Sequence, residues 1–365
     1  MNVFGAIDHA HMAEALRLAA RGMYTTAPNP RVGCVIADGE RVLGRGFHER
    51  AGGPHAEVFA LREAGESARG ATAYVTLEPC AHHGRTPPCA DALAHAGVAR
   101  VVAAIGDPFD RVAGAGFARL RDAGIVVEVG LMEVAARELN IGFLSRIERG
   151  RPFVRVKLAA TLDGRTAPAD GSSLSITSDA ARRDGHRWRA RASAILSGVG
   201  SVRADNPLLT VRLDVPHAAP RRIIADTWLR TPTTSRLLHD RGPRVLIVCG
   251  ERADGERRRA LEATGAEVVA LPVCAARIDL HALMSLLAEQ QVNELHVEAG
   301  ASLAGGLLRA GLVDECVLYQ SHALLGDDAR PLFVDVFPAM MHASLVDERR
   351  IGPDRRLVLR PKRKD

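Results

Sequence analysis

One histidine, one carboxylate and two cysteines in the first quarter of the chain have the types and order of a hydrolytic zinc site. His55 and Glu57 are separated by a single alanine, and Cys80 and Cys89 follow, each directly after a proline. One imidazole and two thiolates give Zn²⁺ three ligands and leave the fourth tetrahedral position for water, which is typical of a catalytic site. The metal makes hydroxide available near neutral pH, and Glu57 can carry a proton from that water to a leaving amine. The pattern therefore predicts a hydrolytic deaminase.

The two cysteines are farther apart than in the common deaminase motif, in which two residues separate them. Eight residues lie between Cys80 and Cys89. The tandem prolines directly before Cys89 favour the start of a helix, where the helix dipole favours a thiolate. The alternative is a closed structural zinc site with His82 or His83 as the fourth ligand. A closed site has four protein ligands and binds no water, so it does not require a proton-transferring carboxylate such as Glu57. The catalytic interpretation is therefore preferred.

Elements of an α/β fold must position these residues. The hydrophobic pattern predicts an amphipathic helix from about residue 8 to 23 and a hairpin over 32–47. Further strands are predicted at 71–77, 101–105 and 125–129, with helical segments between them. This alternation indicates a three-layer α/β domain with the metal ligands at strand-to-helix turns, where open α/β sheets place ligands.

A second α/β domain follows a break in the pattern. Charge, glycine and proline coincide over 148–152, so the predicted domains are residues 1–148 and 151–365. Predicted strands again alternate with helices, and two late β-rich runs, 315–321 and 356–359, are candidates for an antiparallel extension of the sheet. The absence of a G-x-G-x-x-G fingerprint disfavours an ordinary Rossmann domain. Glycine-containing turns at 198–201 and 300–306 suit a pyrophosphate, or are simply tight connections.

Composition restricts the class of protein. The 365 residues are 47% hydrophobic and 25% charged, which is ordinary for a globular protein. The net charge is +5, but basic residues are spread beside acids and only 4% of residues are aromatic, which disfavours nucleic-acid binding. A phosphorylated small molecule explains the basic bias equally well. Six scattered cysteines do not suit a disulfide scaffold, and no apolar run approaches the ~20 residues of a membrane span. We therefore expect a cytoplasmic protein that binds neither nucleic acid nor membranes.

Longer motifs extend over both halves of the chain. They are Pro28–Ile36, His55–Val58, Tyr74–Cys80, His82–Ala90, Lys157–Arg165, Ile176–Ser178, Ala204–Pro207 and Val297–Gly300. Together they resemble the bifunctional deaminase/reductase family of riboflavin biosynthesis, and the resemblance covers nearly the whole chain. The long cysteine spacing is this family's own form of the motif. The resemblance implies a cytidine-deaminase-like three-layer α/β/α domain followed by a dihydrofolate-reductase-like α/β domain.

The same resemblance implies two consecutive reactions. The first is zinc-dependent deamination of 2,5-diamino-6-ribosylamino-4(3H)-pyrimidinone 5′-phosphate. The second is NADPH-dependent reduction of the ribose of 5-amino-6-(5-phosphoribosylamino)uracil to a ribityl chain. The implied cofactors are Zn²⁺ and NADPH, the implied partners are phosphorylated pyrimidine ribotides, and a homo-oligomer is expected.

The resemblance also assigns roles to individual residues. In the first domain, the metal ligands are His55, Cys80 and Cys89, the proton shuttle is Glu57, and the substrate contacts are Asn29, His82 and Arg85. In the second domain, the cofactor contacts are Ala159, Ser175, Ser201, Asp205, Thr227, Gly300, Ala301, Ser302, Leu303, Ala304, Gly305 and Gly306. The substrate contacts there are Lys157, Ser173, Arg189, Leu209, Arg212 and Glu298.

Two departures from the family pattern leave alternatives open. Ser175 stands where the family usually has tryptophan, which removes a stacking or packing contact to the cofactor. Phe109 and Asp110 stand where the family commonly has Asn-Pro, and a changed loop conformation is expected. One alternative is a deaminase of nucleosides or tRNA with the second half as a binding module. Another is a deaminase whose reductase half serves only as a scaffold.

Overall fold

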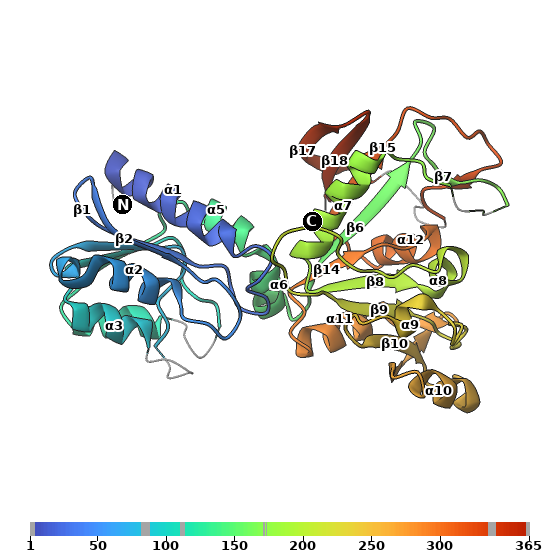
Figure 1. Cartoon of the computed structure of the whole chain (residues 1–365), viewed down its shortest axis with the longest axis horizontal. Coiled ribbons are helices and arrows are strands. Elements are labelled where there is room, and N and C mark those ends of the chain that lie inside the picture. The colour runs from blue at the N-terminus through green and yellow to red at the C-terminus, as the bar shows by residue number, and fades with distance from the viewer. Residues whose placement is uncertain are drawn as a thin grey trace. The chain divides into compact units, whose positions relative to one another are not determined.

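The computed structural model describes residues 4–81, 88–109, 114–170, 172, 174–334 and 341–362. The chain divides into two compact units, Met1–Arg149 and Gly150–Asp365 (Figure 1). Each unit is an α/β structure with its own sheet and its own buried cores, which confirms the predicted fold class. Within the described residues, no helix has the length and apolar character needed to cross a membrane.

The first unit contains a five-stranded sheet in the order β2-β1-β3-β4-β5. β1 pairs antiparallel with β2 and β3, and β3, β4 and β5 are parallel. The strands are β1 (Gly33–Asp38), β2 (Arg41–Phe47), β3 (Thr72–Val75), β4 (Arg100–Ala103) and β5 (Val126–Val129). The helices are α1 (Ala6–Arg21), α2 (Ala56–Ala64), the 3₁₀ turn η1 (Gly65–Ala68), α3 (Cys89–Ala96), α4 (Ala115–Asp122), α5 (Glu133–Leu139) and α6 (Ile141–Arg149).

Helices cover both faces of this sheet because β1 is apolar on both. Cys34 and Ile36 lie in the core beneath α2, α3 and α4, whereas Val35 and Ala37 lie in the opposite core beneath α1 and α6. Successive strand residues point to opposite faces, so a continuous apolar strand requires a layer on each side. The arrangement is the three-layer α/β/α structure that the alternation predicts. Helix α1 begins two residues earlier than predicted, because Asp8 accepts the Gly5 N–H (2.9 Å) from within the first turn.

Helix α2 lies directly on strand β2 at Gly46. A Cβ atom at Gly46 would lie 2.0 Å from the carbonyl oxygen of Ala56 and 2.7 Å from the backbone nitrogen of Ala60. The close approach fixes the first turn of α2, which follows His55 and contains Glu57.

Gly46→Ala should therefore push α2 away from the sheet. We expect the free energy of unfolding of the first unit to fall by about 1–3 kcal/mol, as is usual for overpacking. Urea unfolding checks this. Gly185→Ala in the second unit is the control for adding a Cβ atom, because outside the backbone of its own helix no atom lies within 4 Å there, and alanine is the better helix former. Equal stability of both variants would contradict the close contact.

The second unit contains a nine-stranded sheet in the order β11-β10-β9-β8-β14-β6-β15-β18-β17. The sheet strands are β6 (Phe153–Ala160), β8 (Ala194–Gly198), β9 (Arg221–Ala225), β10 (Val245–Gly250), β11 (Glu267–Leu271), β14 (Glu294–Val297), β15 (Glu315–Gln320), β17 (Ala343–Ile351) and β18 (Asp354–Pro361). The short strands are β7 (Arg165–Ala167), β12 (Val273–Cys274), β13 (Arg277–Ile278) and β16 (Arg330–Pro331). The helices are α7 (Asp179–Arg191), α8 (Val199–Asp205), α9 (Arg236–His239), α10 (Gly255–Glu262), α11 (Leu280–Glu289) and α12 (Ala301–Arg309).

The first seven strands in this order, β11, β10, β9, β8, β14, β6 and β15, are parallel to one another. β18 and β17 then extend the sheet antiparallel. The antiparallel extension is therefore confirmed for β18 but wrong for β15, which pairs parallel with β6. The carboxyl ends of β6, β14, β8 and β9 meet at one edge of the sheet. Parallel α/β sheets place ligands at such an edge.

Candidate active sites

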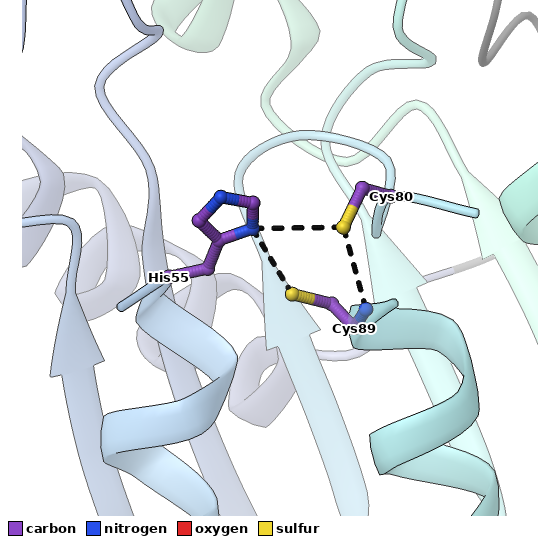
Figure 2. Close-up of side chains that lie close together, drawn as sticks. All are labelled: His55, Cys80 and Cys89. Carbon is purple, nitrogen blue, oxygen red and sulfur yellow. Dashed lines mark hydrogen bonds between the residues drawn. The ribbon is translucent and has the colours of Figure 1, made fainter. Parts of the chain in front are cut away.

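Three potential metal ligands converge in the first unit, as Figure 2 shows. His55 precedes α2 as its N-cap, Cys89 is the first residue of α3, and Cys80 follows β3. His55 Nδ1 lies 3.2 Å from Cys89 Sγ and 3.6 Å from Cys80 Sγ. Tetrahedral zinc with bonds of about 2.1 Å to nitrogen and about 2.3 Å to sulfur holds such atoms about 3.6 Å apart. The donor set therefore fits zinc.

Hydrogen bonds around Cys80 and Cys89 affect how easily the two thiols lose their protons. The backbone N–H of Cys89 donates to Cys80 Sγ (3.3 Å). Hydrogen bonding with the side chain of Cys89, and after it with the imidazole of His55, lowers the pKa of Cys80 and so favours its thiolate form. The hydrogen bond to Cys80 raises the pKa of Cys89, so Cys89 would have to lose its proton to serve as the second thiolate ligand of zinc.

Glu57 lies in the first turn of α2 and is only 3% exposed. Burial raises the pKa of its carboxyl group, which interacts with the thiol of Cys89. The clustered ligand atoms in the described residues belong to His55, Cys80 and Cys89, and Glu57 is not among them. A buried carboxyl group beside the metal position, with a raised pKa, suits the transfer of a proton.

The second unit encloses a cavity of about 1390 Å³ along the carboxyl ends of its parallel strands. Ligand pockets usually measure about 300–1000 Å³, so this one can hold a dinucleotide together with a second substrate. It brings together most of the residues that the sequence assigned to the cofactor and the substrate: Lys157, Ala159, Arg189, Ser201, Asp205, Leu209, Thr227, Glu298, Gly300, Ala301, Ser302, Leu303 and Gly306.

Comparison with known proteins agrees with both sites. Residues 6–105 match the family model described as the cytidine and deoxycytidylate deaminase zinc-binding region, and residues 152–356 match the RibD C-terminal domain. The riboflavin biosynthesis protein RibD of Escherichia coli K12 is 50% identical over 89% of this chain and 90% of its own. The chain belongs to the RibD family.

Solved structures of this family have the same fold along the whole chain. Acinetobacter baumannii RibD superposes with a TM-score of 0.90 at 44% identity, covering 98% of this chain and 99% of that one. A Thermotoga maritima protein described as a diaminohydroxyphosphoribosylaminopyrimidine deaminase/5-amino-6-(5-phosphoribosylamino)uracil reductase has a TM-score of 0.85 at 30% identity, with the same coverage. The resemblance predicted from the motifs is confirmed. A nucleoside or tRNA deaminase with a separate binding module is not favoured.

Not every residue that the family resemblance assigns to a site in the second unit lines its cavity. Ala304 and Gly305 are buried, because they lie on the side of α12 that packs into the protein core. Ser175 is exposed, donates to the carbonyl oxygen of Thr177 (3.3 Å) and accepts from Arg182. Arg212 is also outside the cavity lining. His82, Arg85 and Ser173, together with Asp110, lie outside the described residues.

A buried ion pair with Arg189 holds Glu298 in its charged form in the cavity of the second unit. Arg189 donates from Nε and Nη2 to the two carboxylate oxygens of Glu298 (2.5 and 2.6 Å), and His296 Nε2 lies 3.1 Å from Oε1. Burial by itself raises the pKa of Glu298, but Arg189 and His296 outweigh it and hold the pKa well below the usual value. Burial also lowers the pKa of Lys157, and the charge of Glu298 opposes this. The cavity therefore contains the carboxylate of Glu298, which stays ionised, together with the ammonium group of Lys157, which is more acidic than an exposed lysine.

His48 is a site residue that the sequence reasoning missed. Its Nδ1 lies 3.0 Å from the carbonyl oxygen of Pro54, and its Nε2 lies 3.1 Å from Asn29 Nδ2. A carbonyl oxygen only accepts, so Nδ1 carries the proton and Nε2 accepts from the Asn29 amide. Asn29 Oδ1 is then left to accept from an N–H group of a substrate. A histidine at the end of a strand carries no sequence signal for this role.

Glu78 is a second residue whose role the sequence did not reveal. Its carboxylate accepts the backbone N–H groups of Asp107 (3.1 Å), Gly114 (3.2 Å), Gly116 (2.9 Å) and Phe117 (3.3 Å). It thereby caps α4, whose N-cap Gly114 has no side chain to do so. Glu78 lies two residues before Cys80, so the cap also anchors the segment that carries this ligand.

Proposed function

We propose that the chain catalyses two consecutive steps of riboflavin biosynthesis, the deamination in the first unit and the reduction in the second. The substrates are a phosphorylated diaminopyrimidine ribotide and its deaminated product, as the description of the Thermotoga relative suggests. The observation that carries the proposal is the cluster of His55, Cys80 and Cys89 beside the buried Glu57, in one chain with the reductase cavity. Cytoplasmic location and a homo-oligomeric state remain predictions.

In the deamination, water replaces the 2-amino group of the pyrimidine, and ammonia leaves. Bound zinc supplies a hydroxide near neutral pH. Asn29 orients the ring by accepting one of its N–H groups, since His48 has fixed the direction of the amide. Glu57 takes the proton that water gives up and delivers it to the departing nitrogen. Burial keeps bulk water from competing for that proton.

In the reduction, C1′ of the ribose gains a hydride, its bond to the ring oxygen O4′ breaks, and O4′ gains a proton. Bound NADPH supplies the hydride. Lys157 lines the cavity and is the proton donor, and its lowered pKa makes the transfer easier. Glu298 stays anionic beside Arg189, and its charge stabilises the ammonium form of Lys157 before the proton is transferred to O4′.

The guanidinium of Arg212 is more available than that of Arg189 to bind the substrate phosphate, although Arg212 lies outside the lining of the cavity. The guanidinium of Arg189 already has partners within the protein. It forms an ion pair with Glu298 and donates from Nη1 to the carbonyl oxygen of Thr210 (2.8 Å). Arg212 is exposed, and among the described residues its guanidinium has no ion pair or hydrogen bond. Its backbone N–H donates to His186 Nδ1 (3.1 Å), which keeps it near Arg189.

Arg212→Gln should therefore raise the KM of the reduction for the phosphorylated substrate by about tenfold or more, because a charge-assisted hydrogen bond contributes about 1.5–3 kcal/mol. Affinity for NADPH should not change. Steady-state kinetics and NADPH titration measure the two effects, and Arg212→Lys should restore part of the loss. A KM equal to that of the unaltered protein would remove Arg212 from the substrate site.

The function itself is tested with the full chain and the diaminopyrimidine ribotide. Ammonia release should be followed by NADPH oxidation, and removal of zinc by a chelator should stop both, because the reduction then receives no deaminated substrate. Supplying the deaminated product should restore NADPH oxidation in the chelated protein. Ammonia release from tRNA or free nucleosides, and not from the ribotide, would overturn the proposal. Failure to oxidise NADPH with the deaminated product would show that the second unit is only a scaffold.

A further inference from the structure

The reductase cavity is long, and its two ends lie on different strands. Lys157 on β6 and Glu298 after β14 mark one end. Thr227 after β9, together with the β12–β13 hairpin beside β10, marks the other. In the sheet order, β9 lies three strands from β6 and β10 lies four. With strands about 4.8 Å apart, these ends are separated by about 14–19 Å, which suits an extended dinucleotide. The start of α12 at Gly300, which has no side-chain cap, lies between them.

A tight turn after β9 directs two side chains away from the core at the far end. The carboxylate of Asp226 accepts from the backbone N–H (2.6 Å) and the hydroxyl (2.7 Å) of Thr231, which closes the turn. Between them, Leu229 has a φ of +52° and is only 2% exposed. Because Leu229 points inward, its neighbours Trp228 and Arg230 are exposed, and both line the cavity.

The β12–β13 hairpin brings a second arginine to the same end. The two residues at its tip, Ala275 and Ala276, have φ values of +48° and +62°, a left-handed conformation that costs free energy for any residue with a Cβ atom. Arg277 follows directly and lines the cavity. The backbone N–H of Ile278 donates to Thr227 Oγ1 (3.3 Å), which ties the hairpin to the turn after β9.

The far end carries positive charge that is not neutralised within the protein. Arg230 and Arg277 are exposed, and in the part of the chain that the structure describes neither guanidinium has an ion pair or a hydrogen bond. The nearby acid that lines the cavity, Asp279, is engaged in capping α11, where it accepts the N–H groups of His281 (2.7 Å) and Ala282 (3.2 Å). A dianionic group entering this end therefore meets two free guanidinium groups.

We propose that this end binds the adenosine 2′-phosphate of NADPH, with Arg230 and Arg277 as phosphate ligands and Trp228 as the surface on which adenine stacks. The inference deepens the proposed reductase function and rests on it. Guanidinium groups pair with phosphate through parallel hydrogen bonds, and NADH offers only a hydroxyl group at the same position. The subsite therefore determines the preference for NADPH over NADH.

Calorimetric titration of the zinc-loaded full chain tests this without any turnover. The probes are NADPH, NADH, adenosine 2′,5′-bisphosphate and 5′-AMP. Arg230→Gln and Arg277→Gln should each weaken binding of NADPH and of the bisphosphate about 10- to 100-fold, with NADH and 5′-AMP unaffected. Trp228→Leu should weaken all four, because adenine is common to them. Arg252→Gln is the charge-matched control, since Arg252 is exposed and does not line the cavity.

The outcomes separate the subsite from the reductase function. If the unaltered chain binds NADPH and NADH equally, or if the arginine variants lose both equally, the subsite is wrong and the reductase function stands. If the unaltered chain binds neither dinucleotide, the reductase function fails, and the subsite fails with it. An equal loss in Arg252→Gln would indicate a general effect of charge and would also overturn the subsite.

Discussion

Glu57→Gln should lower ammonia release by about 10²- to 10⁴-fold, the usual contribution of a positioned general acid-base group. The amide has the size of the carboxyl group but cannot accept the proton of the attacking water or deliver it to the leaving amine. Zinc content should stay near that of the unaltered protein, because Glu57 is not one of the clustered metal ligands. The reduction of deaminated substrate should also be unchanged, because it takes place in the other unit.

Cys89→Ser provides the comparison that makes this result specific. Cys89 is a ligand, so its replacement should lose zinc and ammonia release together. Metal analysis alongside ammonia assays distinguishes the two variants. Near-normal deamination by Glu57→Gln would show that another group moves the proton, and loss of zinc from Glu57→Gln would show that the carboxylate is a ligand after all.

Lys157→Met should lower the rate of ribose reduction by about 10²-fold or more, because the ring oxygen loses its proton donor. The variant should still fold, since Glu298 keeps its partners Arg189 and His296 and is not left as an unpaired buried charge. NADPH binding, measured by titration, should persist. Glu57→Gln serves as the control that alters the other site and leaves the reduction intact.

The pH dependence gives an independent readout for Lys157. A proton donor must be charged before the reaction, so reduction should fall as pH rises through the pKa of Lys157. Burial lowers this pKa, so the alkaline loss should begin below the usual lysine value of about 10.4. The residual activity of Lys157→Met should lack this loss. Near-normal reduction, or an unchanged alkaline limb in the variant, would assign the proton to another group.

Much of the zinc site could be predicted from the sequence, because its information is local. His55 and Glu57 lie two residues apart at the start of one helix, and a proline directly precedes each of Cys80 and Cys89. The chemistry of imidazole, thiolate and carboxylate then indicates zinc as the metal and hydrolytic deamination as the reaction. Alternation of apolar strands and helices likewise predicts two α/β units, because backbone hydrogen bonding and side-chain periodicity act over a few residues.

Only the tertiary structure decided which distant groups meet. Glu78 accepts N–H groups from residues 29 to 39 positions later, and no residue type marks a backbone amide as its partner. His48 fixes Asn29 through a carbonyl oxygen, and Arg230 and Arg277 reach one end of the cavity from two different loops. β15 joined the sheet parallel to β6, since strand neighbours are selected by packing of the whole sheet. Local sequence determines the secondary-structure elements and the reactive groups. The partners of those groups depend on contacts between distant segments, which form only when the chain folds.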